Sequence, residues 1–166
     1  MDHQLAGLSA GFSPATLMNM PNKLALPPLL VELCQQNRWK HPGDDVIQSL
    51  IPYIKEPVHF ITCEHLRPLP TPDIIADDLT LRPVFHITRG SEENRFVELP
   101  WIDAELTIFI ADNRIPGDDV AIALDFRTDL QDPRVVASDW WTLENQGCIW
   151  REVAPTFSEF VAQLSL

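Results

Sequence analysis

The sequence contains little glycine, with six glycines against fifteen prolines in 166 residues. Loops that wrap a phosphate or a dinucleotide need clustered glycines, and the chain has neither a G-x-G-x-x-G run nor a Walker loop. The many prolines instead predict short elements joined by stiff turns. A glycine-rich ligand loop is therefore not expected, and we predict no bound cofactor.

Metal and redox signatures are absent as well. The chain has no H-E-x-x-H and no C-x-x-C sequence, so neither a zinc-protease helix nor a redox pair can be placed. We therefore predict no catalytic residues and no metal ligands, which makes the protein a non-enzyme.

Cysteine is scarce. Cys34, Cys63 and Cys148 are far apart in sequence and odd in number, whereas a disulfide scaffold needs more cysteines in a shorter chain. Residues 1–20 contain no Lys or Arg, which argues against a signal peptide, and no apolar run approaches the roughly 18 residues of a membrane span. We expect three free thiols and a cytoplasmic protein that contacts no membrane.

The overall composition is that of a globular protein, with 45% hydrophobic and 22% charged residues. A chain of 166 residues fits one domain of ordinary size. We interpret residues 1–22 as a flexible N-terminal leader and residues 23–166 as a single domain.

Positive charge is sparse in the second half of the chain. Residues 1–90 carry nine acids and seven bases, a net charge of −2, whereas residues 91–166 carry fifteen acids and five bases, a net charge of −10. Such a field repels nucleic acid and attracts a basic protein partner. The alternative is that the acidity serves solubility alone.

Three segments have helical patterns. Leucines spaced over residues 26–34 form one apolar face behind a proline pair, and Asp44 can cap a helix over 44–51 that Pro52 ends. At the C-terminus, Thr156 and Glu159 form a capping box ahead of an apolar stripe.

Other segments alternate or are rich in β-branched residues, which is typical of strands. They are residues 58–62, 84–88, 106–111, 120–126 and 134–140. The last three are separated by turns and predict an antiparallel meander. In 120–126 the large residues alternate with small ones, which predicts a central strand with another element packed closely on its small side.

The predicted meander gathers acidic and aromatic residues at one edge of the sheet, because its first and third strands end there. The candidate binding residues are Asp112, Asp118, Asp119, Asp139, Trp140 and Trp141. The two adjacent tryptophans point to opposite faces, so one of them is expected to be exposed and suited to a binding hot spot. In the alternative interpretation one tryptophan is core and the aspartates cap turns.

Metal sites remain a weaker alternative. A calcium loop that begins at Asp112 would put Arg114 and Pro116 at ligand positions, so that template fails. The spacing of His59, Cys63 and His65 permits part of a zinc site, with His86 as a further donor. We rank this set below unlinked core and loop positions.

The second half of the chain resembles the SUKH (Smi–Knr) superfamily. The similarity lies in Leu99–Asp103, Pro116–Asp125 and Asp132–Trp140, and in Pro155–Val161, which looks like the closing helix of that family. The resemblance implies an α+β fold: a single domain with a twisted, mainly antiparallel sheet and helices packed against it.

The resemblance also implies a function. Many bacterial members of the superfamily are regarded as immunity proteins that neutralise a polymorphic toxin, and others as regulatory modules. We therefore expect a non-enzymatic protein-binding domain whose partner is a basic protein, a toxin domain. A regulatory adaptor for a peptide or small ligand is the first alternative, and a small metal-dependent hydrolase using the aspartates is the second.

Overall fold

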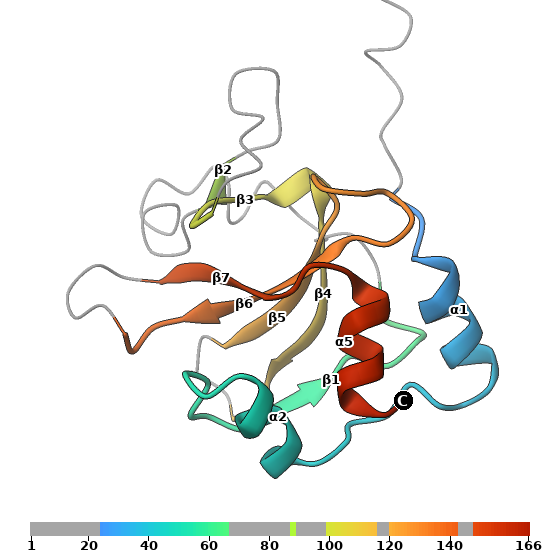
Figure 1. The fold of residues 1–166 in the computed structure, drawn as a ribbon, viewed down its shortest axis with the longest axis horizontal. Coiled ribbons are helices and arrows are strands. Elements are labelled where there is room, and N and C mark those ends of the chain that lie inside the picture. The colour runs from blue at the N-terminus through green and yellow to red at the C-terminus, as the bar shows by residue number, and fades with distance from the viewer. Residues whose placement is uncertain (1–23, 67–86, 89–98, 116–119, 143–147) are drawn as a thin grey trace, which may run out of the picture.

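A computed structural model gives the fold, which is α+β (Figure 1). It describes residues 24–66, 87–88, 99–115, 120–142 and 148–166. The leader predicted over 1–22 lies outside these ranges. Within them, helices pack against an antiparallel sheet, as predicted, and this sheet has five strands.

The sheet has the strand order β1-β4-β5-β6-β7, and every neighbouring pair is antiparallel. Its strands are β1 (Val58–Phe60), β4 (Thr107–Asn113), β5 (Ala121–Asp125), β6 (Arg134–Asp139) and β7 (Ile149–Ala154). The predicted three-stranded meander is confirmed as β4, β5 and β6. The sequence patterns did not predict β7, which pairs with β6 at one edge of the sheet.

The central strand β5 separates two apolar clusters. Ile122 and Leu124 belong to the main core under the helices, whereas Ala121 and Ala123 belong to a second cluster on the other face. Trp150 of β7 also belongs to this second cluster and is 1% exposed. The alanines leave space that the large indole fills, which confirms the predicted close packing on the small side.

Three described helices cover the main-core face (Figure 1). They are α1 (Pro28–Gln35), α2 (Asp44–Leu50) and α5 (Phe157–Leu164). Beyond the C-cap Gln36 of α1, Asn37 has a φ of 56°, a left-handed conformation that asparagine tolerates and that ends the helix. Gly43, with a φ of 119°, is the N-cap of α2, so Asp44 lies inside the helix and does not cap it as predicted. The Thr156 side chain accepts a hydrogen bond from the Glu159 N–H, as expected of the C-terminal capping box.

The expectation of three free thiols is wrong, because Cys34 and Cys63 form a disulfide. Cys34 lies on α1 and Cys63 follows β1, and the packing of helix on strand places their Cα atoms 5.9 Å apart. Trp39 strengthens the same junction, since its ring stacks on Phe60 with centroids 4.5 Å apart. Cys148 is free and buried. The 29-residue separation of the bonded pair explains why spacing gave no sign of it.

A smaller element lies on the second face, where β2 (Ile87–Thr88) pairs in parallel with β3 (Ile102–Asp103). A short 3-10 helix, η2 (Ala104–Leu106), follows β3 and leads into β4. Only the last two residues of the strand predicted over 84–88 are described, and they do form a strand. In the part of the chain that the structure describes, no helix has the length and apolar character needed to cross a membrane.

A buried ion network closes the end of β5. Asp125 is 0% exposed and accepts hydrogen bonds from the guanidinium groups of Arg127 and Arg134, with the nearest nitrogens at 2.7 Å. Arg134 also lies 3.8 Å from Glu152 of β7. Because the two cations surround one buried carboxylate, this network joins β5, β6 and β7 at the end of the sheet opposite to the predicted binding edge.

Candidate functional site

The predicted binding edge is only partly described. Asp112 ends β4 and Asp139 ends β6, so both lie at the same end of the sheet, as the meander requires. Asp118 and Asp119 lie outside the described residues.

Asp112 and Asp139 face opposite sides of the sheet because β4 contains a bulge. The register with β5 shifts between Phe109 and Ala111, so Ala111 faces the main core directly after Ile110. Asp112 therefore lies opposite Ala121 on the second face. Unbroken alternation from Ile110 would have put Asp112 on the helix side, together with Asp139.

Asp139 is a buried structural carboxylate and not the exposed acid that we predicted. Its side chain is 0% exposed; Oδ1 accepts from the N–H groups of Trp141 and Thr142 at 2.9 and 3.0 Å, and Oδ2 lies 2.5 Å from Arg151 Nε. Burial raises the pKa of Asp139, but hydrogen bonds from Thr142, Trp141 and Arg151 together bring that pKa below its usual value. Asp139 thus holds the turn that presents Trp141.

Asp112 lies beside His59 of β1, its partner across the strands. The distance from His59 Nδ1 to Asp112 Oδ1 is 3.0 Å, and both side chains are about half exposed, at 52% and 40%. Burial raises the pKa of Asp112, and the nearby His59 offsets this only in part. The pair puts a carboxylate beside an imidazole at the surface of this edge.

The two tryptophans divide as the alternation predicts, and the exposed one is Trp141. Its side chain is 48% exposed, whereas Trp140 is half-buried. An exposed indole costs no core packing when it is lost, so Trp141 is available for a contact with another molecule.

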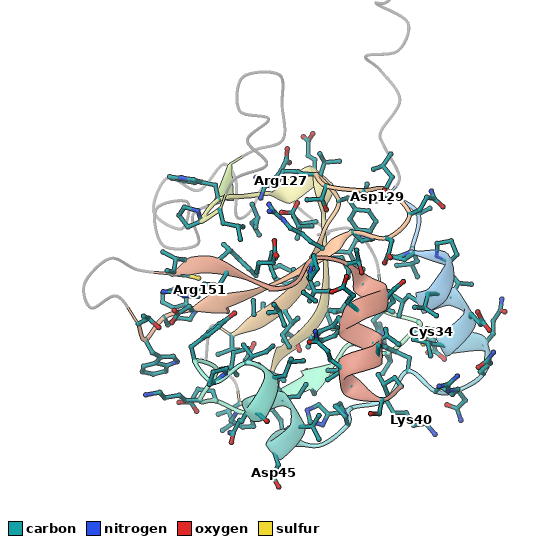
Figure 2. The ribbon with its side chains drawn as sticks, in the orientation of Figure 1. Cys34, Lys40, Asp45, Arg127, Asp129 and Arg151 are labelled. Atoms are coloured by element: carbon teal, nitrogen blue, oxygen red, sulfur yellow. A yellow bond between two sulfur atoms is a disulfide. The ribbon has the colours of Figure 1, made fainter. Side chains whose placement is uncertain are left out.

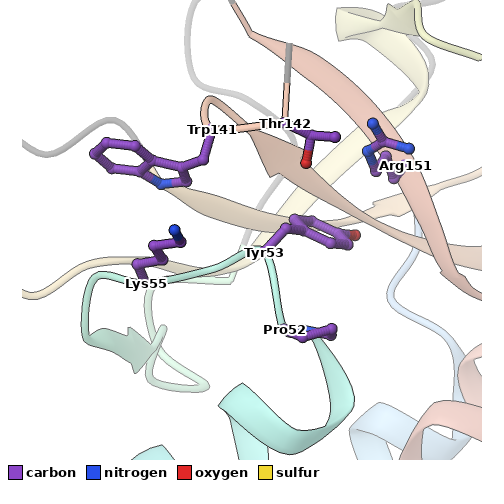
Figure 3. Close-up of a pocket in the computed structure, with 6 residues that line it drawn as sticks. All are labelled: Pro52, Tyr53, Lys55, Trp141, Thr142 and Arg151. Atoms are coloured by element: carbon purple, nitrogen blue, oxygen red, sulfur yellow. The ribbon is translucent and has the colours of Figure 1, made fainter. Parts of the chain in front are cut away.

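Trp141 lines a pocket on the helix side of the sheet (Figure 3). The pocket, here called the Trp141 pocket, has a volume of about 460 Å³ and is lined by Pro52, Tyr53, Lys55, Trp141, Thr142 and Arg151. The first three belong to the segment after α2, Trp141 and Thr142 follow β6, and Arg151 lies on β7. In the close-up the Tyr53 ring lies between Lys55 and Arg151, and the Trp141 indole lies on the Lys55 side.

Cations and aromatic rings alternate around this pocket. The Arg151 guanidinium carbon lies 5.9 Å from the centre of the Tyr53 ring, within the range of a cation–π contact. The Tyr53 hydroxyl is shielded from solvent and has no hydrogen-bond partner among the described residues. Burial raises the pKa of Tyr53, and the charge of Asp139 raises it further. Tyr53 therefore stays neutral and offers its ring to the pocket.

The zinc set predicted as an alternative does not form. Cys63 is bonded to Cys34, His59 faces Asp112, and the His65 Nδ1 lies 2.7 Å from the Thr62 hydroxyl. His86 lies outside the described residues. In the described ranges no group of three or more His, Cys, Asp or Glu side chains is arranged to hold a metal ion.

A serine motif at residues 7–11 bears on the prediction of no catalytic residues. Gly7 to Gly11 reads G-x-S-x-G around Ser9, the pattern of a nucleophile elbow. Such an elbow joins a strand to a helix in an α/β-hydrolase sheet. Residues 7–11 lie outside the described ranges, and the described main sheet is antiparallel throughout. Within the described ranges, the main sheet is therefore not the parallel sheet in which this five-residue pattern forms an elbow.

Sequence reasoning missed Tyr53, Lys55 and Arg151 as site residues. Tyr53 is the only tyrosine, and Arg151 is one of five bases among residues 91–166, so a search for rare residue types could have selected both. Their convergence could not be foreseen, because it depends on β7 and on the path of the chain after α2.

No protein-family model, curated protein or solved structure matches the chain. The SUKH resemblance therefore stays a prediction that rests on the sequence patterns alone.

Proposed function

We propose that this chain is a non-enzymatic protein-binding domain that contacts its partner through the surface around Trp141. The observation that carries the proposal is the exposure of this indole at 48%, on a turn that the buried Asp139 holds in place. Rigid, exposed aromatic side chains beside a pocket are typical of interface hot spots. The non-enzymatic character rests on the sequence motifs, and ester hydrolysis that Ser9→Ala abolishes would contradict it.

The kind of partner is proposed from the resemblance and from charge. A SUKH-like domain suggests an immunity protein that neutralises a bacterial polymorphic toxin. The net charge of −12 favours a toxin domain that is basic overall, because opposite charge accelerates association. A regulatory adaptor is the alternative function. The immunity proposal predicts that the partner protein is toxic when it is expressed without this chain, whereas the adaptor proposal predicts that it is not.

An immunity protein of this type acts in the cytoplasm, and we propose that location. The Cys34–Cys63 disulfide instead favours an oxidising compartment, because disulfides persist mainly in such compartments. Rapid alkylation of thiols in intact cells decides the matter. A reduced pair supports the cytoplasm, and an oxidised pair supports an oxidising compartment.

Site-specific cross-linking tests the proposed contact. A photo-reactive amino acid replaces Trp141 in one variant and Leu130 in a matched control; Leu130 is 60% exposed and lies on the turn between β5 and β6, at the opposite end of the sheet. We expect one protein to cross-link from position 141 and not from position 130. Co-expression of the chain should then relieve the toxicity of that protein. Equal cross-linking from both positions contradicts the proposed surface.

A further inference from the structure

The Trp141 pocket differs in charge from the chain that contains it. The six described residues that line it include two of the twelve bases and no acid, in a protein of net charge −12. From this contrast we infer that the pocket binds the carboxylate of a glutamate or aspartate side chain on the protein partner. The inference rests on the proposed function, and it names the chemistry of the residue that enters the pocket.

Arg151 is held ready for a carboxylate. Its Nε is engaged by Asp139 at 2.5 Å, which fixes the plane of the guanidinium group. Among the described residues, no acceptor lies within hydrogen-bond distance of its two terminal nitrogens, and 38% of its side chain is exposed. Two parallel N–H groups of a guanidinium match the two oxygens of a carboxylate.

Lys55 supplies the charge that Arg151 alone does not. Since Asp139 neutralises Arg151, the excess positive charge at the pocket comes from the exposed Lys55 ammonium group. In the described part of the chain, no acidic side chain pairs with Lys55. A carboxylate between Lys55 and Arg151 would therefore be attracted without displacing an internal partner.

The aromatic rings make a side chain a better ligand than a small anion. Tyr53 and Trp141 give the pocket apolar walls against which the methylene groups of glutamate or aspartate can pack. The pocket is a shallow depression that is open to solvent, with a volume of about 460 Å³. An isolated inorganic anion would leave these walls uncovered.

Nuclear magnetic resonance on the full-length oxidised protein tests this inference with three capped peptides: Ac-Gly-Glu-Leu-NH2, its Gln analogue and its Lys analogue. The readout is the indole N–H signal of Trp141, which is one of five indole signals and is identified by its absence in Trp141→Phe. We expect the Glu peptide to shift this signal saturably and the Gln peptide to bind about tenfold more weakly, the loss typical of a charge-assisted hydrogen bond. The Lys peptide should leave the signal in place.

Charge-reversal variants complete the test. Lys55→Glu should abolish the response to the Glu peptide, and Lys55→Arg should retain it. Lys40→Glu is the matched control, since it changes net charge equally on an exposed lysine far from Arg151 (Figure 2). Equal binding of the Glu and Gln peptides, or equal losses in the two Glu variants, overturns the inference. So does a response to inorganic phosphate as tight as that to the Glu peptide.

These results are independent of the cross-linking test. A cross-link from position 141 together with no response to the Glu peptide overturns the carboxylate inference and leaves the binding surface standing. Absence of the cross-link contradicts the proposed function itself.

Discussion

Arg151 and Asp139 form the link between the interior of the sheet and the Trp141 pocket. The carboxylate is fully buried and accepts hydrogen bonds from both the Arg151 side chain and the turn that carries Trp141. One aspartate thus holds both the guanidinium of Arg151 and the main chain that carries Trp141. A residue that resembles a surface acid in the sequence is the group that organises the site.

Asp139→Asn should therefore destabilise the protein. The substitution removes charge-assisted hydrogen bonds from a buried position, which costs about 2 kcal/mol of unfolding free energy. Urea unfolding at pH 7 measures this loss. Glu32→Gln on the exposed surface of α1 is the control and should change the unfolding free energy by less than about 0.5 kcal/mol.

The lowered pKa of Asp139 also predicts that the free energy of unfolding depends on pH. Because the folded pKa of Asp139 is lowered, its stabilising effect is present above the unfolded pKa of about 3.9 and disappears as pH falls through the lower folded value. The gap in stability between the wild-type protein and Asp139→Asn should narrow in acid. A gap that is constant from pH 7 to pH 3 would show that charge has no part in it.

Asp112→Asn should affect stability at pH 7 in the opposite direction to Asp139→Asn. The folded pKa of Asp112 is raised, so its ionised form costs stability above that pKa, and the cost is relieved as pH falls through it. At pH 7 the substitution should leave the thermal unfolding midpoint unchanged or raise it. A loss as large as that of Asp139→Asn would mean that the two carboxylates are equivalent, against the difference in their burial.

Cys34→Ser with Cys63→Ser should lower the unfolding free energy by about 3 kcal/mol, because the bond closes a loop of some thirty residues in the unfolded chain. Mass spectrometry after alkylation in denaturant without reductant should find one modified cysteine, Cys148. Cys148→Ser is the control for the loss of a single thiol. Three modified cysteines in protein purified without reductant would contradict the disulfide.

Asp125→Asn should be among the most destabilising single changes. It leaves the guanidinium groups of Arg127 and Arg134 buried beside a neutral side chain, and breaking such a network costs about 3–5 kcal/mol. Denaturant unfolding measures the effect. Asp45→Asn on the exposed side of α2 serves as the matched control and should be nearly neutral.

Local signals made part of this fold predictable. The Thr156–Glu159 capping box and the apolar stripe behind it define α5, and the alternation in 120–126 defines β5 together with its packing on Trp150. β7 escaped prediction because its alternation is interrupted by charge. Arg151 and Glu152 are two charged residues inside the strand. Their presence there is explained by their ion-pair partners on β6, which are Asp139 and Arg134 respectively.

The candidate site was less predictable, for two reasons of tertiary structure. The bulge before Ala111 reverses the face of Asp112, and nothing in the alternation of Ile108 and Ile110 signals it. The disulfide joins cysteines whose proximity depends on how α1 packs on β1. The strand ends could be placed from the sequence, but the direction of each side chain and the residues across from it could not.

Leu130 is a better distant control for binding than the aspartates beside it. Asp132 accepts a hydrogen bond from the Ser158 N–H at the start of α5, and Asp129 accepts from the N–H groups of Gln131 and Asp132. Their removal would disturb the fold. Leu130 is 60% exposed and can be truncated without that effect.

The dissociation rate of the complex with the cross-linked partner tests the account most directly. If Trp141 anchors the interface, Trp141→Ala should weaken binding by about 2 kcal/mol, roughly thirtyfold, mainly through faster dissociation. Leu130→Ala should bind like the wild-type protein. Unchanged dissociation of Trp141→Ala, with the variant folded, would contradict the claim that this surface is where the protein meets its partner.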